Sequence, residues 1–173
     1  MSLNISVPLT PELVRRLEQY GFHTFNGIPR VVDASAAQSV LDAWTPADAA
    51  AEKCAQVWDH AAALFEALTS GYSATEKSSW SEIERQARVW LATRIDGQAP
   101  WCVQEAQYRS RPAAPVTIEQ IALRVVAGAD RLSALRPIIA GVRGRHCDAI
   151  NGLAAVGDFD GIYEYDYSTG WPT

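Results

Sequence analysis

Five aromatic side chains lie close together near the C-terminal end of the chain, at Phe159, Tyr163, Tyr165, Tyr167 and Trp171. The three tyrosines alternate with acidic residues, and this period of two predicts an extended segment with an aromatic face. Tyrosine and tryptophan join an apolar ring to a polar tip, which suits them to anchor one protein on another. We therefore expect the five residues to bind a protein partner; the alternative is that they add a strand to a hairpin near the N-terminus.

Residues that could perform catalysis or bind a metal are few and scattered. The three cysteines and three histidines are Cys54, Cys102, Cys147, His23, His60 and His146. An odd number of widely spaced cysteines favours reduced thiols over a disulfide framework. The histidines show no metal-ligand spacing, and no G-x-S-x-G nucleophile motif occurs. The prediction is a protein with no catalytic residue, no metal ligand and no cofactor, and so not an enzyme.

Charge is unevenly distributed along the chain, although the net charge is only −5. Residues 109–147 carry seven arginines against two acids, whereas residues 148–173 carry five acids and no base. The basic segment and the acidic tail could pair with each other or across an interface, or could simply be solvated faces. An arginine-rich nucleic-acid binder is a further alternative, but a net acidic chain argues against nucleic acid as the main partner.

Residues 1–44 predict a small helix–hairpin–helix unit. Thr10 and the proline after it are typical of a helix start, and this first helix should end near Tyr20, before Gly21. Asn26-Gly27 is a hairpin turn dipeptide between two short apolar runs. A capping box at 35–38 should begin a second helix that ends near Trp44.

Residues 45–153 predict a helical domain. Cap signals at Thr45, Ser73 and Thr117 open helices at about 46–70, 74–93 and 117–150. The first should bury a stripe through Cys54, Trp58, Ala61, Phe65 and Leu68. Residues 94–115 contain several prolines and Gly97, so we expect an irregular connection there.

The last long helix carries an apolar seam with alternating spacings of three and four residues. The seam positions are Ile121, Val125, Leu132, Leu135, Ile139 and Val142. They predict either an ordinary packed core or a coiled-coil interface with another chain, including another copy of this one. Pro137 lies within the same helix and should kink or break it near residues 133–136.

The expected fold class is mainly α: a helical hairpin or bundle over 45–153, the small unit at 1–44, and an extended aromatic tail at 154–173. No apolar stretch approaches the roughly 20 residues of a membrane-spanning helix, and the first 30 residues do not resemble a signal peptide. We therefore expect no membrane association.

Two parts of the chain resemble helical proteins of bacteriophage tail fibres and of tail-fibre assembly. One is residues 61–93, with Gly71-Tyr72-Ser73, Trp80 and Trp90, followed by a last helix at 118–150. The other is the ending Asp166 to Pro172, which closes in Gly-Trp-Pro. Together the resemblance covers about 110 residues.

This resemblance implies a non-enzymatic assembly chaperone that binds the phage tail-fibre protein in the host bacterial cytoplasm. It leaves open a permanent, homo-oligomeric component of the tail fibre or baseplate in the virion. Fibre subunits with β-rich shafts pair slowly and expose strand edges meanwhile, so a protein that shields them would assist assembly.

Overall fold

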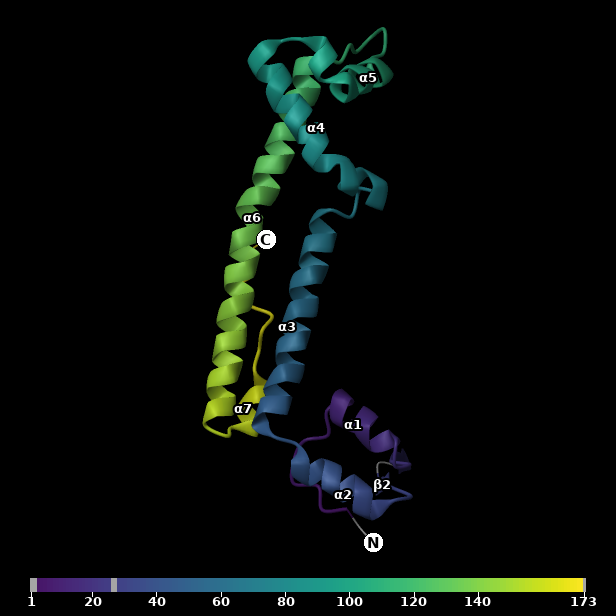
Figure 1. The fold of residues 1–173 in the computed structure, drawn as a ribbon, viewed down its shortest axis with the longest axis vertical. Coiled ribbons are helices and arrows are strands. Elements are labelled where there is room, and N and C mark those ends of the chain that lie inside the picture. The colour runs from purple at the N-terminus through teal and green to yellow at the C-terminus, as the bar shows by residue number, and fades with distance from the viewer. Residues whose placement is uncertain (1–2, 26–27, 173) are drawn as a thin grey trace. The chain divides into compact units, whose positions relative to one another are not determined.

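The structure is a computed structural model that describes residues 3–25 and 28–172 (Figure 1). The described chain is mainly helical, which confirms the predicted fold class. Its helices are α1 Pro11–Glu18, α2 Ala34–Ala43, α3 Pro46–Leu68, α4 Ala74–Thr93, α5 Pro100–Arg109, α6 Ile118–Ala155 and α7 Phe159–Glu164, with a 3-10 turn at Asp96–Gln98. Its strands are β1 His23–Phe25 and β2 Ile28–Arg30.

Side-chain caps start α1, α3, α4 and α6 where the sequence predicted them. The hydroxyl of Thr10 accepts from the N–H of Leu13, and the Ser73 and Glu76 pair forms a reciprocal capping box at α4. At α6 the N–H of Gln120 donates to the hydroxyl of Thr117, and the amide oxygen of Gln120 accepts from the N–H of Thr117. These short-range bonds satisfy helix N–H groups that have no partner within the helix.

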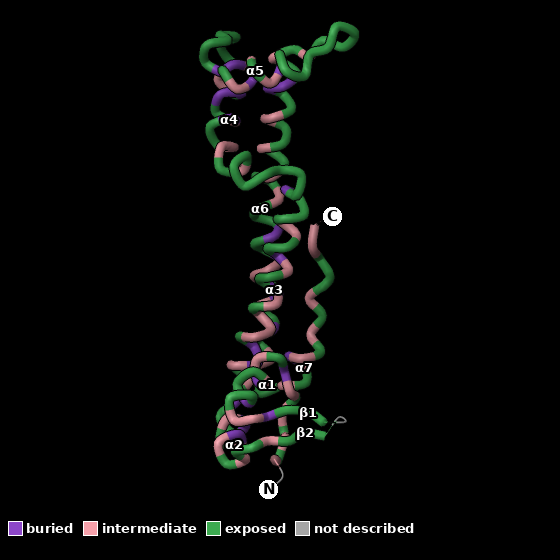
Figure 2. The backbone as a smooth tube through the Cα atoms, turned by 90° about the vertical axis from the view of Figure 1, so that its right-hand side faces the viewer, coloured by how far each residue is buried: buried purple, intermediate pink, exposed green. Residues whose placement is uncertain are grey.

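The small N-terminal unit has the predicted elements, with one correction at α2. Asp33, and not Ser35, caps this helix, because the Asp33 carboxylate accepts from the N–H of Ala36 at 3.0 Å. The strands β1 and β2 pair antiparallel, with His23 opposite Arg30. Their residues are all exposed and appear green in Figure 2. The predicted turn at Asn26-Gly27 lies outside the described residues.

The irregular connection expected at 94–115 is wrong, because ten of its residues form α5. Pro100 is the first residue of this helix, where its missing N–H costs no hydrogen bond. Pro100 therefore begins a helix and does not interrupt one. Residues 110–117 remain irregular, with a single bridge between Arg111 and Ala114.

Of the kink or break expected near residues 133–136, the break is wrong, because α6 runs without interruption from Ile118 to Ala155. Pro137 is exposed, so its ring faces away from packed side chains. Ile139 and Val142, on the C-terminal side of Pro137, are buried, and Leu132 and Leu135 on its N-terminal side are half-buried. Tertiary packing of this kind can outweigh an unfavourable local propensity.

The tail is not extended throughout, which corrects the period-two interpretation of residues 157–167. Asp158 caps α7 by accepting from the N–H of Gly161 at 2.8 Å, and Ile162 of this helix is completely buried. The Asp158 cap and the burial of Ile162 therefore make the first half of the segment helical. After α7, the residues from Tyr165 to Pro172 have no helical assignment.

The chain divides into two compact units. Unit 1 comprises the residues up to 63 together with 141–171, and unit 2 comprises residues 64–140. The core of unit 1 is built around Leu13, Leu17, Trp44, Val57, Ile150 and Ile162. The core of unit 2 is built around Ala87, Trp90, Cys102, Ile121 and Ala122.

No helix in the described part of the chain is both long enough and apolar enough to cross a membrane.

Candidate functional site

The aromatic residues of the tail are partly buried against the core of unit 1. Tyr163 accepts a hydrogen bond at its hydroxyl from the indole of Trp44 at 3.1 Å, and its carbonyl accepts from Lys53 at 2.8 Å. Burial raises the pKa of the Tyr163 phenol, and burial lowers the pKa of Lys53. Phe159 stacks on Tyr163 with the two rings 6.4 Å apart. Phe159 and Tyr163, which the sequence predicted to bind a partner, thus contact other residues of this chain.

The end of the tail packs around two histidines of unit 1. His146 lies 3.0 Å from the Tyr165 hydroxyl through Nδ1 and 3.1 Å from the Thr169 carbonyl through Nε2. The ring of Trp171 lies 5.1 Å from that of His60 and 5.5 Å from that of His146. Tyr167 also contacts His60, and its carbonyl accepts from the Trp171 indole. The tail is therefore held by specific polar and aromatic contacts.

The seam predicted on the last helix is used largely inside the fold. Ile121 belongs to the core of unit 2, and Ile139 and Val142 are buried. Val125, Leu132 and Leu135 are only half-buried. The packed-core interpretation therefore fits the two ends of the seam, whereas its middle keeps some exposed apolar surface.

Three of the seven arginines of residues 109–147 make separate side-chain contacts. Arg109 pairs with Glu105, Arg136 lies over the ring of Phe65, and Arg143 lies over the ring of Trp58. Among the described residues, no salt bridge joins these arginines to the acids of the tail. The acids nearest Lys53 include Asp166, whose pKa is lowered first by hydrogen bonds from Ser168 and also by the positive charge of Lys53.

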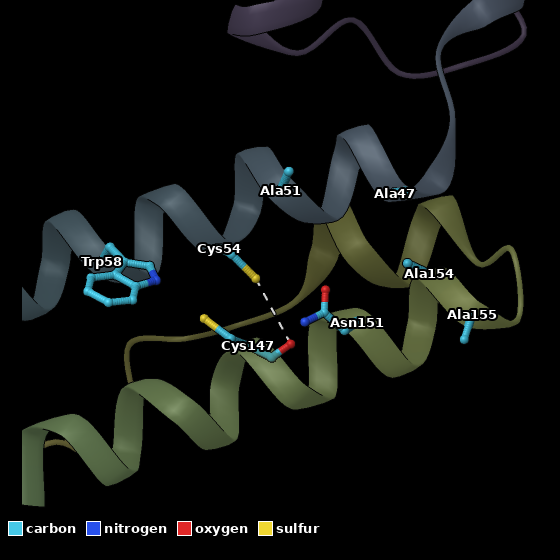
Figure 3. Close-up of a pocket in the computed structure, with 8 residues that line it drawn as sticks. All are labelled: Ala47, Ala51, Cys54, Trp58, Cys147, Asn151, Ala154 and Ala155. Carbon is cyan, nitrogen blue, oxygen red and sulfur yellow. Dashed lines mark hydrogen bonds between the residues drawn. The ribbon is translucent and has the colours of Figure 1, made fainter.

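One surface depression of unit 1 is a groove of about 520 Å³ between the first half of α3 and the last part of α6 (Figure 3). Its lining consists of Ala47, Ala51, Cys54, Trp58, Cys147, Asn151, Ala154 and Ala155. Most of these are small side chains, so another protein backbone can approach closely. We call this surface the alanine groove.

Trp58 lines the alanine groove, and Arg143 lies against its ring. Trp58 is 54% exposed although the sequence placed it on a buried stripe, and this placement was wrong. The buried face of α3 instead passes through Val57 and Ala61. The guanidinium carbon of Arg143 lies 3.5 Å from the centre of the indole, a cation–π contact that holds both side chains in place.

Two thiols lie on the floor of the alanine groove, one from each helix. The thiol of Cys54 donates to the backbone carbonyl of Cys147 at 4.0 Å, across 93 residues of sequence. Burial, which is the largest cause, and the neighbouring Cys147 thiol together raise the pKa of the Cys54 thiol to about 12. Cys102, in contrast, is completely buried in the core of unit 2.

A second, smaller depression of unit 1 lies between α1 and α3 and is filled by a polar network. The hydroxyl of Thr10 donates to Glu52 at 2.5 Å, and the N–H of Glu12 donates to the same carboxylate. Lys53 and Tyr163 line its other side. These groups satisfy one another and hold the start of α1 against α3, so a structural role explains them.

No group of three or more metal-binding side chains occurs in the part of the chain that the structure describes. Comparisons of the chain with protein families, with curated proteins and with solved structures found no match.

The sequence does not predict the alanine groove. Trp58 looked like a core residue because it falls at helical spacing from Cys54 and Ala61. The spacing alone could not show that the neighbouring residue Val57, and not Trp58, faces the core. No sequence signal pairs Cys54 with Cys147, since the approach of α3 to α6 depends on the tertiary fold.

Proposed function

We propose that this protein binds another protein through the alanine groove and acts as an assembly chaperone without catalytic activity. The observation that carries the proposal is the exposed Trp58 held beneath Arg143 at the groove. Tryptophan and arginine are the residues most enriched among interface residues that dominate binding energy. The pair is also pre-ordered, so binding would cost little side-chain entropy.

The small side chains beside this pair favour a rigid apolar partner segment. Ala47, Ala51 and Ala155 are exposed and leave room for a helix or strand to lie along the groove. Burying an exposed tryptophan and several alanines removes apolar area from water, which drives association. The groove thus provides a central anchor with a shallow apolar surround.

The resemblance to phage proteins suggests the partner, a tail-fibre subunit. This part of the proposal rests on the residues of 61–93, the last helix and the Gly-Trp-Pro ending. A chaperone would leave the fibre after assembly, whereas a structural component of the fibre or baseplate would stay in the particle. In either case the groove is the surface that we assign to fibre binding.

The test is co-expression of the full chain with the tail-fibre subunit of the phage that encodes it, followed by measurement of complex formation and of trimeric fibre yield. Trp58→Ser should weaken binding by about tenfold or more, as expected for the loss of a central anchor. Tyr108→Ser is the matched control, because Tyr108 is 86% exposed on α5 and lies outside the groove. Circular dichroism should show that both variants remain folded.

Equal binding by wild type and Trp58→Ser would contradict the role of the groove, and no binding by wild type would contradict the choice of partner. Mass spectrometry of purified particles then separates the two forms of the proposal. A fixed ratio of this chain to the fibre indicates a structural component, and its absence from particles that require it for assembly indicates a chaperone.

A further inference from the structure

The thiols of Cys54 and Cys147 face each other inside unit 1. Figure 3 shows the Cys54 sulfur pointing from α3 toward α6 and the Cys147 sulfur pointing back from α6 toward α3. The Cys54 sulfur lies 4.0 Å from the backbone oxygen of Cys147, so the two residues are direct neighbours. Neither sulfur belongs to the closed core, because both cysteines are half-buried and line an open groove.

We propose that Cys54 and Cys147 form a dithiol site that reacts with small-molecule disulfides and closes to an intramolecular disulfide between α3 and α6. The inference does not depend on the proposed function, because it concerns two side chains and a small reagent. It adds a covalent modification to a chain whose sequence predicts only reduced thiols.

The position of the pair permits both parts of this reaction. The exposed alanines of the groove, including Ala51, leave a path for a small disulfide to reach the sulfurs. Disulfide formation requires the two Cβ atoms to come within roughly 3.5–4.5 Å of each other. The 4.0 Å approach of the Cys54 sulfur to the Cys147 backbone oxygen places the two side chains within reach of each other, and closure would bring their Cβ atoms to this separation.

The reaction balances as two successive thiol–disulfide exchanges. First, the Cys147 thiolate attacks one sulfur of the reagent, forms a mixed disulfide and releases one reagent thiolate. Next, the Cys54 sulfur loses its proton, attacks the Cys147 sulfur of the mixed disulfide and releases the second reagent thiolate. The protein loses two electrons and two protons, and the reagent disulfide is reduced to two thiols.

The surroundings of the two sulfurs indicate this order of attack. The thiolate is the reactive form of cysteine, and burial raises the pKa of Cys54 to about 12. Asp148, next to Cys147 in sequence, adds a negative charge that opposes ionisation of Cys54. Cys54 therefore suits the second step, where the mixed disulfide is already held beside it, and closure should become faster as the pH rises.

The bond would fix the separation of α3 and α6 at the alanine groove. It would also close a loop of 93 residues, which restricts the unfolded chain and raises the thermal midpoint. The oxidised protein should therefore have a more rigid groove than the reduced protein.

The experiment uses the full chain with an excess of oxidised glutathione, followed by alkylation of the remaining thiols and peptide mapping without reduction. The expected product is a peptide pair linked through Cys54 and Cys147, with Cys102 alkylated. The oxidised protein should unfold at a midpoint about 5 °C or more above the reduced one, and dithiothreitol should reverse the shift.

Two variants identify the separate steps. In Cys54→Ser, one glutathione should accumulate on Cys147, because no second thiol can displace it. In Cys147→Ser, glutathione should be added to Cys54 at least about tenfold more slowly. Cys102→Ser is the matched control and should form the linked pair at the wild-type rate.

The proposal is overturned if linked peptides involving Cys102 form as readily as the Cys54–Cys147 pair, or if all three cysteines stay unmodified in the folded protein while reacting in denaturant. These readouts come from the isolated protein, so failure of fibre binding would not affect them.

Discussion

His146 is the residue on which the end of the tail depends most directly. Its Nε2 faces the carbonyl of Thr169, which can only accept, so Nε2 carries a proton and donates. Its Nδ1 then accepts from the Tyr165 hydroxyl in the neutral ring. One side chain on α6 therefore fixes two points of the tail and, by stacking, the ring of Trp171.

Replacing His146 with alanine should release residues 165–171 from unit 1. The substitution removes two hydrogen bonds and leaves the hydroxyl of the half-buried Tyr165 without its partner, which we expect to lower the free energy of unfolding by about 2 kcal/mol. Hydrogen exchange of the tail amides and Trp171 fluorescence would measure the release. His23→Ala, at an exposed hairpin position, is the control and should change stability by less than about 0.5 kcal/mol. Unchanged tail protection in His146→Ala would refute this role.

At the scale of elements, α5 begins without a cap of its own. Its N-cap residue is Ala99, whose side chain cannot accept a hydrogen bond. The buried Gln86 of α4 performs this function, because its side-chain oxygen accepts from the N–H of Trp101 at 3.1 Å while its nitrogen donates to Glu82 at 2.9 Å. A neighbouring helix thus supplies the cap that the local sequence lacks.

Gln86→Ala should therefore weaken the start of α5. The variant leaves a helix N–H without a partner, at an expected cost of about 1–2 kcal/mol in the free energy of unfolding, similar to the loss of an N-cap. Chemical denaturation measures the total loss, and hydrogen exchange at residues 101–103 shows its location. Gln107→Ala, exposed on α5, should have little effect, and an equal loss in both variants would argue against the capping role.

The long helix α6 tolerates Pro137 at a cost that substitution can reveal. The proline cannot donate the backbone hydrogen bond expected at this position, and its side chain is exposed. Pro137→Ala should restore the bond without removing buried contacts and raise the free energy of unfolding by about 1–3 kcal/mol. Thermal and urea unfolding test this gain. Pro115→Ala, outside the helices, provides the comparison and should be neutral or slightly destabilising.

At the scale of the whole molecule, the two units differ in the size of the side chains that they bury. The large completely buried side chains of unit 1 include Leu13, Leu17, Val57, Ile150 and Ile162. Unit 2 buries Cys102 and several alanines completely, and its larger buried core residues include Trp90 and Ile121. Since apolar area removed from water contributes roughly 25 cal/mol per Å², unit 1 has the larger stabilising term.

Local opening should consequently require less free energy in unit 2 than in unit 1. Native-state hydrogen exchange would compare the amides of Ala87 and Cys102 with those of Leu17 and Val57, and the first pair should exchange at lower free energy. Identical exchange energies for the four amides would mean that the chain opens as one cooperative unit. Because all four residues are nearly or completely buried, solvent exposure of the side chain does not bias the comparison.

The sequence by itself determined most of the helices and their starts. Caps at Thr10, Ser73 and Thr117 depend on bonds to residues three positions away, so their signals lie within a few letters of sequence. The apolar composition and spacing also predicted a mainly α fold correctly. The part of the sequence interpretation that concerns function, a tail-fibre assembly role, stays a prediction.

Only the tertiary structure decided which apolar residues are buried and which elements meet. Val57 and Trp58 are adjacent in sequence, and the position of the neighbouring helix determines which of them faces water. Likewise, Gln86 caps α5 and Cys54 meets Cys147 through contacts between segments distant in sequence. Helix periodicity specifies the relative directions of side chains on one helix, but the direction that faces the core is set by packing between helices, which a single segment does not encode.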